Sequence, residues 1–195
     1  MQAKLLKAYN VGMPVDTRLT YEDLLALPDD GRRHEIINGE HFVTPSPLRK
    51  HQIVVIQLGR LMAEFLLERR LGEVYTAPFD VILSNHDVVQ PDLMVVLNDR
   101  LKRMTERGVQ GAPNLVIEVL SEATERRDRG EKLKLYAKYG VCEYWLVDPE
   151  AETIEVYSPS ESLQPREHIR PPDTLKSPLL AGFSVPLRKV FHFER

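Results

Sequence analysis

Short apolar runs, separated by polar and turn-forming residues, dominate the second half of the chain. The clearest are Leu93–Leu97, Leu115–Leu120 and Cys142–Val147. Runs of this length bounded by turn residues are typical of strands buried in a sheet. Nearer the start, Arg33–Ile37 and Glu40–Thr44 flank Asn38-Gly39, a dipeptide that favours a tight hairpin turn. The pattern therefore predicts a sheet, with a hairpin early in the chain.

A long amphipathic helix is predicted from Ser46 to Arg70. Its apolar residues recur at intervals typical of one helix face: Ile53, Ile56, Leu58, Leu61, Met62, Phe65 and Leu66. Ser46 should cap this helix, with Pro47 at the first helical position, where a missing N–H costs nothing. The helix should cover one face of the sheet.

A second helix is predicted from Glu122 to Tyr139, with Ser121 and Thr124 as candidate caps. Three of its residues are spaced by four and should share one face: Asp128, Lys132 and Tyr136. An ordinary surface ion pair between Asp128 and Lys132 would show the same spacing. A functional role for this helix face depends on the neighbouring strand that contains Glu118.

The length and composition favour one domain. At 195 residues with 43% hydrophobic content, the chain can bury one sizeable core. We assign residues 20–195 to a single α/β domain with hairpin additions at both ends, preceded by an arm of residues 1–19. A short helix capped by Thr20 should open the domain, and Phe183–Val190 should close it in an edge hairpin.

Charge and cysteine content narrow the classes of function. A formal net charge of -3 argues against binding nucleic acid by bulk electrostatics alone, but it allows a local basic face. The single cysteine, Cys142, allows no internal disulfide. No apolar run reaches the ~18 residues of a membrane span. We expect a cytoplasmic protein without a membrane partner.

Two acids stand where hydrocarbon is expected. Asp92 opens one apolar run and Glu118 interrupts the next, near its carboxyl end. A buried carboxylate costs several kcal/mol unless it is paired or binds a cation. Oxygen ligands favour Mg²⁺ or Mn²⁺, and no cysteine and histidine cluster with zinc spacing is present. Asp92 and Glu118 are therefore candidate metal ligands on neighbouring strands.

Other polar groups are weaker candidates. Glu35 lies within the first strand of the hairpin. His51 lies near the start of the long helix, where a histidine is more often a hydrogen-bonded structural residue than a catalyst. The segment Asn98–Val109 is basic, and it either contacts phosphates or covers a solvated face.

An ordered set of residues carries a family resemblance that runs from about Tyr21 to Phe183. The set is Glu35-Ile36-Ile37-Asn38-Gly39-Glu40, Pro91-Asp92, Glu118, Ser121, Thr124, Asp128, Lys132, Tyr136, Gly140-Val141, Glu143-Tyr144-Trp145 and Asp148-Pro149. In this order the residues resemble the Uma-type restriction endonuclease family, a branch of the PD-(D/E)XK nuclease superfamily. The resemblance implies a restriction-endonuclease-like central mixed sheet flanked by helices. It also implies a divalent metal held by Asp92 and Glu118, with Glu35 completing the site.

One position departs from the superfamily pattern. Leu120 stands two residues after Glu118, where a lysine is expected. The resemblance suggests that Lys132, on the following helix, takes its place. Lys134 is the rival, but it lies about 200° away around the helix and cannot face the same site. Lys132 is preferred because it shares its face with Asp128 and Tyr136.

Three functions from different classes follow. The first is a Mg²⁺- or Mn²⁺-dependent nuclease that hydrolyses phosphodiester bonds in double-stranded DNA, with a homodimer as the simplest way to cut both strands. The second is an inactive nucleic-acid-binding or regulatory module, and the third is a structural protein with a buried acidic network. Cleavage of nucleic acid would support the first function, and binding without cleavage would support the second. The absence of both would support the third. Because two carboxylates repel each other without metal, replacing Asp92 or Glu118 by alanine should leave the fold intact and could raise its stability.

Overall fold

The computed structural model describes residues 17–193, so most of the predicted arm lies outside the described residues. The first elements are α1 (Tyr21–Leu25), β1 (Arg33–Ile37), β2 (Glu40–Thr44), α2 (Arg49–Arg69), β3 (Gly72–Thr76), β4 (Asp80–Ser84), β5 (Asp87–Val89) and β6 (Leu93–Leu97). The later elements are a 3₁₀ turn (Leu101–Arg103), β7 (Gly108–Gln110), β8 (Leu115–Val119), α3 (Glu125–Arg127), a π-helical turn (Asp128–Lys132), α4 (Leu133–Tyr139), β9 (Glu143–Asp148), β10 (Thr153–Tyr157), β11 (Glu167–Ile169), β12 (Thr174–Lys176), β13 (Ser184–Pro186) and α5 (Arg188–Phe191).

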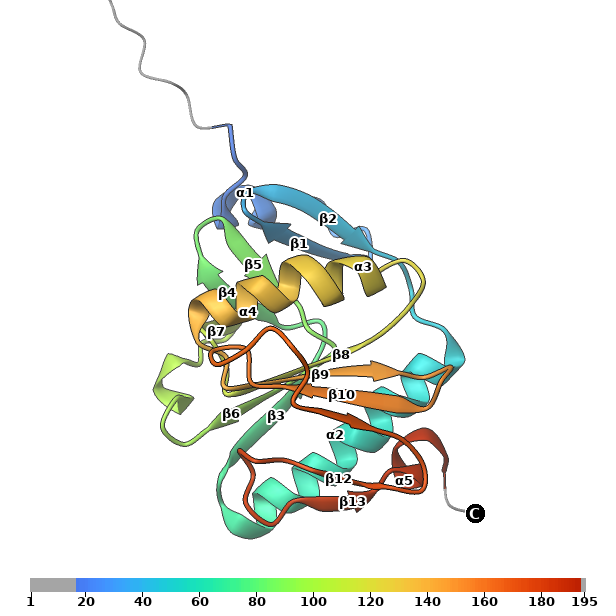
Figure 1. Ribbon diagram of the computed structural model, residues 1–195. Helices are drawn as coiled ribbons and strands as arrows, with labels where there is room; N and C mark the ends of the chain where they lie inside the picture. The colour runs from blue at the N-terminus through green and yellow to red at the C-terminus, as the bar shows by residue number, and fades with distance from the viewer. Residues whose placement is uncertain (1–16, 194–195) are drawn as a thin grey trace, which may run out of the picture.

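A mixed six-stranded sheet forms the centre, in the order β11-β10-β9-β8-β6-β3, with β8 and β9 parallel and the other pairs antiparallel. The predicted central mixed sheet with flanking helices is therefore confirmed. The predicted N-terminal hairpin, β1-β2, is also present, but it belongs to a second sheet of five strands, β2-β1-β5-β4-β7. At the other end, β12 and β13 form a separate hairpin. Figure 1 shows α2 on one side of the central sheet and the α3–α4 segment on the other.

Alternation along β8 divides the core into two parts. Leu115, Ile117 and Val119 join the apolar cluster that contains α2 and the C-terminal hairpin. Val116 and Leu120 join the opposite cluster, which contains α4 and side chains of the five-stranded sheet. Because successive side chains of a strand point to opposite faces, Glu118 lies on the α4 side with Val116 and Leu120.

The long helix α2 covers the sheet as expected, with two corrections. It begins at Arg49, and Leu48 at the cap position offers no side-chain hydrogen bond, so neither Ser46 nor Pro47 starts it. Ile56 is 53% exposed, whereas Val54 and Leu58 are buried. Since 100° separates successive helix residues, Ile56 lies far around the helix from these two and cannot share their face. No helix within residues 17–193 is both long and apolar enough to cross a bilayer.

The second predicted helix is present but irregular. A π-helical turn, Asp128–Lys132, separates α3 from α4, and Thr124 makes no side-chain cap bond to the helix. Gly140 ends the segment in the left-handed conformation, with φ of 77°, as expected of a helix terminator. Cys142 precedes β9 and is partly exposed, so its placement inside a strand was wrong.

The basic segment after β6 has a structural role. Arg100 donates to the carbonyl oxygens of Ala112, Pro113 and Gly140, and Arg103 donates to that of Ala112. Backbone carbonyls that lack sheet partners are satisfied in this way. These two guanidinium groups therefore hold loops together and are committed to the protein itself.

Candidate active site

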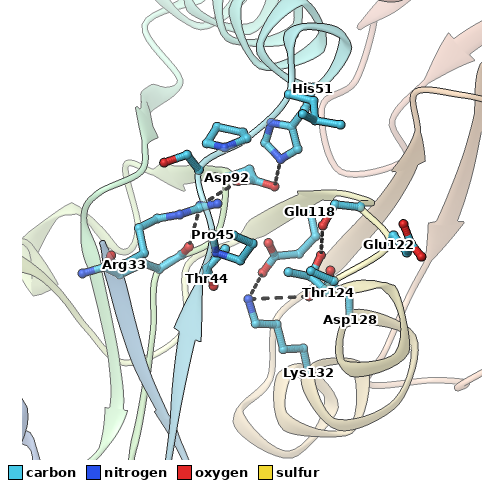
Figure 2. Close-up of a pocket in the computed structure, with 16 residues that line it drawn as sticks. Arg33, Thr44, Pro45, His51, Asp92, Glu118, Glu122, Thr124, Asp128 and Lys132 are labelled. Atoms are coloured by element: carbon cyan, nitrogen blue, oxygen red, sulfur yellow. Dashed lines mark hydrogen bonds and ion pairs between the residues drawn. The ribbon is translucent and has the colours of Figure 1, made fainter. Parts of the chain in front are cut away.

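Asp92 and Glu118 enter the same pocket from neighbouring strands. β6 and β8 are antiparallel, with Leu93 opposite Ile117, and Asp92 directly precedes β6. The backbone N–H of Val119 donates to Asp92 Oδ2 at 2.8 Å, which fixes the aspartate beside the glutamate's own strand. Both side chains line a cavity of about 230 Å³ (Figure 2). The expectation that the two strands would be neighbours is confirmed.

The Asp92 carboxylate is buried, but it accepts hydrogen bonds from several protein donors. Arg33 Nη1 lies 2.7 Å from its Oδ1, and His51 Nε2 lies 3.1 Å from its Oδ2. Burial alone would raise the pKa of Asp92, but hydrogen bonding and charge from His51, together with Arg33 and the Val119 N–H, lower it to about 2. This carboxylate is ionised at every physiological pH.

Glu118 is in the opposite situation. Its Oε1 accepts from Lys132 Nζ at 2.9 Å and from the Tyr136 hydroxyl at 2.8 Å. Burial nevertheless raises its pKa to about 8: Lys132 opposes the shift, but the charges of Asp128, Asp92 and Glu35 add to it. Near neutral pH the metal-free protein therefore keeps a proton on Glu118.

Lys132 is the cation at the centre of three carboxylates. Its Nζ lies 2.8 Å from Glu35 Oε1, 2.9 Å from Glu118 Oε1 and 3.6 Å from Asp128 Oδ1. Burial would lower the pKa of Lys132, but these three charges raise it well above its ordinary value. Burial also raises the pKa of Asp128, more than Lys132 lowers it. The lysine is thus locked in its charged form.

The helix geometry places Lys132, and not Lys134, beside Glu118. The structure brings Lys132 to Glu118, while Lys134 is exposed at the surface. Leu120 is buried in the apolar cluster beside α4. Asp128, Lys132 and Tyr136 share one face as predicted, although a π-helical turn connects the first two. Such turns often occur at functional sites.

Two arginines near the acids were not among the sequence candidates. Arg33 contacts Asp92, and Arg127 Nη2 lies 3.7 Å from Glu35 Oε2. Arg33 precedes Glu35 by two positions in β1, so the two side chains share a face. That spacing was a usable signal for Arg33. The approach of Arg127 depends on how α3 packs against the hairpin and has no such signal.

The residues present fit a cation that keeps most of its water. Within residues 17–193, no three histidine, cysteine, aspartate or glutamate side chains are arranged to coordinate one metal ion. Magnesium is usually held by only one or two carboxylates plus water and substrate phosphate. Glu118 Oε2 accepts no hydrogen bond from the described residues, and Asp92 Oδ1 accepts one from Arg33. Two carboxylate oxygens with free lone pairs therefore face the same cavity.

Comparison with known proteins assigns the chain to a family. The Uma2 family model, described as "Putative restriction endonuclease", matches residues 21–188. An uncharacterized protein of Synechocystis sp. is 27% identical over 143 residues, which cover 72% of this chain and 74% of that protein. The crystal structure of an Anabaena variabilis protein described as "a putative nuclease belonging to DUF820" superposes with a TM-score of 0.75 at 23% identity, covering 89% of this chain and 97% of that one. The match over residues 21–188 shows that the chain belongs to the Uma2 family.

Proposed function

We propose that the chain is a Mg²⁺- or Mn²⁺-dependent endonuclease that hydrolyses phosphodiester bonds in DNA. The observation that carries the proposal is the meeting of Asp92, Glu118 and Lys132 in one pocket, although they come from a loop, a strand and a helical segment. Two carboxylates and a locked ammonium suit phosphoryl chemistry, which needs a place for a cation and a fixed positive charge.

Asp92 and Glu118 would hold the cation through their free oxygen lone pairs. When bound, Mg²⁺ or Mn²⁺ would supply Lewis acidity toward a phosphate oxygen and a more acidic water. Glu118 must lose its proton to serve as a ligand, so cation binding and deprotonation are linked at this carboxyl.

Lys132 would stabilise the negative charge that develops on the phosphate. Its ammonium is held at a fixed position by Glu35 and Glu118, and a preorganised charge needs no rearrangement during the reaction. Glu35 would act through Lys132 and not as a ligand, because it does not line the cavity and its Oε1 accepts from the lysine and from the Gln90 N–H at 2.8 Å. Tyr136 and His51 would orient the two carboxylates.

The family supports DNA as the substrate, since restriction endonucleases cut DNA. Double-stranded DNA, a homodimer that would cut both strands and a cytoplasmic location belong to the proposal as sequence-based predictions. A binding module without turnover is the second candidate. It is favoured by one observation: Arg33 donates to the Asp92 oxygen that a cation would use, and so competes with the cation for it.

Cleavage assays test the proposal directly. Purified protein should be incubated with supercoiled, linear duplex and single-stranded DNA, and with RNA, in Mg²⁺, Mn²⁺ or chelator. We expect cation-dependent DNA cleavage that is lost in Glu118→Gln and kept in Glu131→Gln, a matched change at an exposed glutamate of the π-helical turn. DNA binding without cleavage would favour the second candidate. An absence of both would support a structural role for the acids.

A further inference from the structure

Arg33 lies at the junction of two cavities. It begins β1 and reaches Asp92, placing Nη1 2.7 Å from Oδ1 and 3.4 Å from the Gln90 carbonyl oxygen (Figure 2). Arg33 lines both the cavity of about 230 Å³ that contains Glu118 and an adjoining one of about 380 Å³. Asp92 also borders the second cavity, whose lining includes Arg32 and Gln52 but not Glu118. A bound polymer that passes from one cavity to the other would meet Arg33.

Most of the guanidinium is uncommitted. Only Nη1 has a hydrogen-bond partner among residues 17–193, so Nε and Nη2 have none there. Arginine presents five N–H donors in a planar fork, which matches a phosphate group through paired hydrogen bonds. The side chain is 18% exposed, compared with 4% for Lys132. Of these two cations in the first cavity, Arg33 is the one that a phosphate can reach.

The first cavity is lined by more acidic than basic side chains. Its four acidic side chains are those of Asp92, Glu118, Glu122 and Asp128, whereas Arg33 and Lys132 are its arginine and lysine side chains. Lys132 is already surrounded by carboxylates. A phosphodiester entering this cavity would be repelled unless a cation became available to it.

We propose that Arg33 is a phosphate-binding residue that exchanges partners. In the free protein its guanidinium holds Asp92 Oδ1; in the DNA complex it yields that oxygen to the divalent cation and binds a backbone phosphate. This inference rests on the proposed function. The exchange is chemically balanced, because the aspartate keeps a cationic partner and the arginine keeps an anionic one throughout.

The exchange predicts two effects of opposite sign. Without Arg33, Asp92 loses a competitor of the cation, so cation binding should tighten. DNA loses a phosphate contact, so DNA binding should weaken. A residue that only held Asp92 in place would do neither, since its removal would misplace the carboxylate and weaken cation binding.

The test uses the full chain with Arg33→Gln and Arg33→Lys. Arg60→Gln is the matched control, because Arg60 is an exposed arginine of α2 that pairs with Glu64. Binding of Mn²⁺ alone is measured by calorimetry. Binding of a fluorescent DNA duplex of about 20 base pairs, or two turns of B-DNA, is measured by fluorescence anisotropy. The titrations are made in Ca²⁺ at several salt concentrations, after gels confirm that the duplex stays intact.

We expect Arg33→Gln to bind Mn²⁺ at least about threefold more tightly than the wild type, because one contact that competes with the cation is lost. It should bind the duplex about tenfold more weakly, and the slope of log K against log salt should fall by about one. Arg33→Lys keeps the charge without the fork, so its DNA affinity should lie between these values. Arg60→Gln should match the wild type in both assays.

Several outcomes would overturn the inference. Unchanged DNA affinity and salt slope in Arg33→Gln, or weaker Mn²⁺ binding, would show that Arg33 only positions Asp92. If Arg33→Gln does not fold, Arg33→Lys decides, and wild-type duplex affinity in that folded variant would refute phosphate binding. If the wild type cuts DNA and the Arg33→Gln variant cuts it with an unchanged KM, the inference about Arg33 is refuted but the proposed function is not. A wild type that neither cuts nor binds DNA refutes the proposed function, whereas the Mn²⁺ comparison does not depend on cleavage.

Discussion

Replacing Glu118 with glutamine should make the metal-free protein more stable at alkaline pH. Glutamine keeps the shape of the side chain, and its carbonyl oxygen can still accept from Lys132 and Tyr136. It removes only the charge. The other side chains around Lys132 are unchanged, so Lys132 keeps its contacts with Glu35 and Asp128.

The sign of the effect follows from the pKa of Glu118. The group titrates near 4.5 in the unfolded chain and at about 8 in the folded protein. The folded state therefore binds the extra proton between these pH values, so wild-type stability falls as pH rises through this window. The glutamine variant lacks the fall. Its advantage should be near zero at pH 4 and largest above about pH 9.

The magnitude follows from the same two pKa values. At about 1.4 kcal/mol per pKa unit, the difference between 4.5 and about 8 sets a ceiling of about 5 kcal/mol. Small movements of Lys132 and entry of water will relieve part of the repulsion in the wild type. We expect a gain of roughly 2–5 kcal/mol at pH 9.

Urea unfolding followed by circular dichroism, in chelator and at pH values from 4 to 9, measures the effect. Glu131→Gln is the control for a change of net charge at an exposed position. Mg²⁺ added at pH 8 should stabilise the wild type and not the Glu118→Gln variant, because a ligand stabilises only the state that binds it. Parallel pH curves for the wild type and Glu118→Gln, or a less stable variant at pH 9, would refute the reasoning.

Three further predictions concern the other site residues. Asp92→Asn should cost about 2 kcal/mol at pH 7 and much less at pH 2, because the pKa of Asp92 is lowered from 3.8 to about 2. This is the opposite pattern to Glu118→Gln. Urea unfolding at both pH values measures it, and a variant as stable as the wild type at pH 7 would contradict it. Lys132→Ala should reduce cleavage by ~10²-fold or more, while Lys134→Ala, at an exposed position, stays near the wild-type rate, and equal rates for Lys132→Ala and the wild type would refute the assignment. Cation binding at pH 7 should release about one proton from Glu118, which calorimetry in two buffers of different ionisation enthalpy detects; identical heats in both buffers would exclude it.

The structure changes one expectation about the acids. The sequence suggested that Asp92 and Glu118 repel each other equally, so that removing either would leave the fold intact or more stable. The geometry separates them. Asp92 has Arg33, His51 and a backbone N–H as donors, so its charge stabilises the fold. Glu118 lies deeper among like charges, so its charge opposes folding.

The sequence by itself determined the elements and the candidate acids. Alternation along β8 placed Glu118 on one face, Asn38-Gly39 specified the hairpin, and the four-residue spacing brought Lys132 and Tyr136 to one side of their helix. These features are local, because backbone geometry fixes which neighbouring side chains share a face.

Only the tertiary structure decided which groups meet across elements. The contacts of Asp92 with Arg33, of Lys132 with Glu35, and of Arg127 with Glu35 join residues more than fifty positions apart. No local periodicity specifies such pairs, since they depend on how the two sheets and the helical segment pack. The pKa values of Asp92 and Glu118 differ for the same reason. Each pKa reflects the burial of the carboxyl group and the charges around it in the folded protein, and these surroundings exist only once the distant elements have packed together.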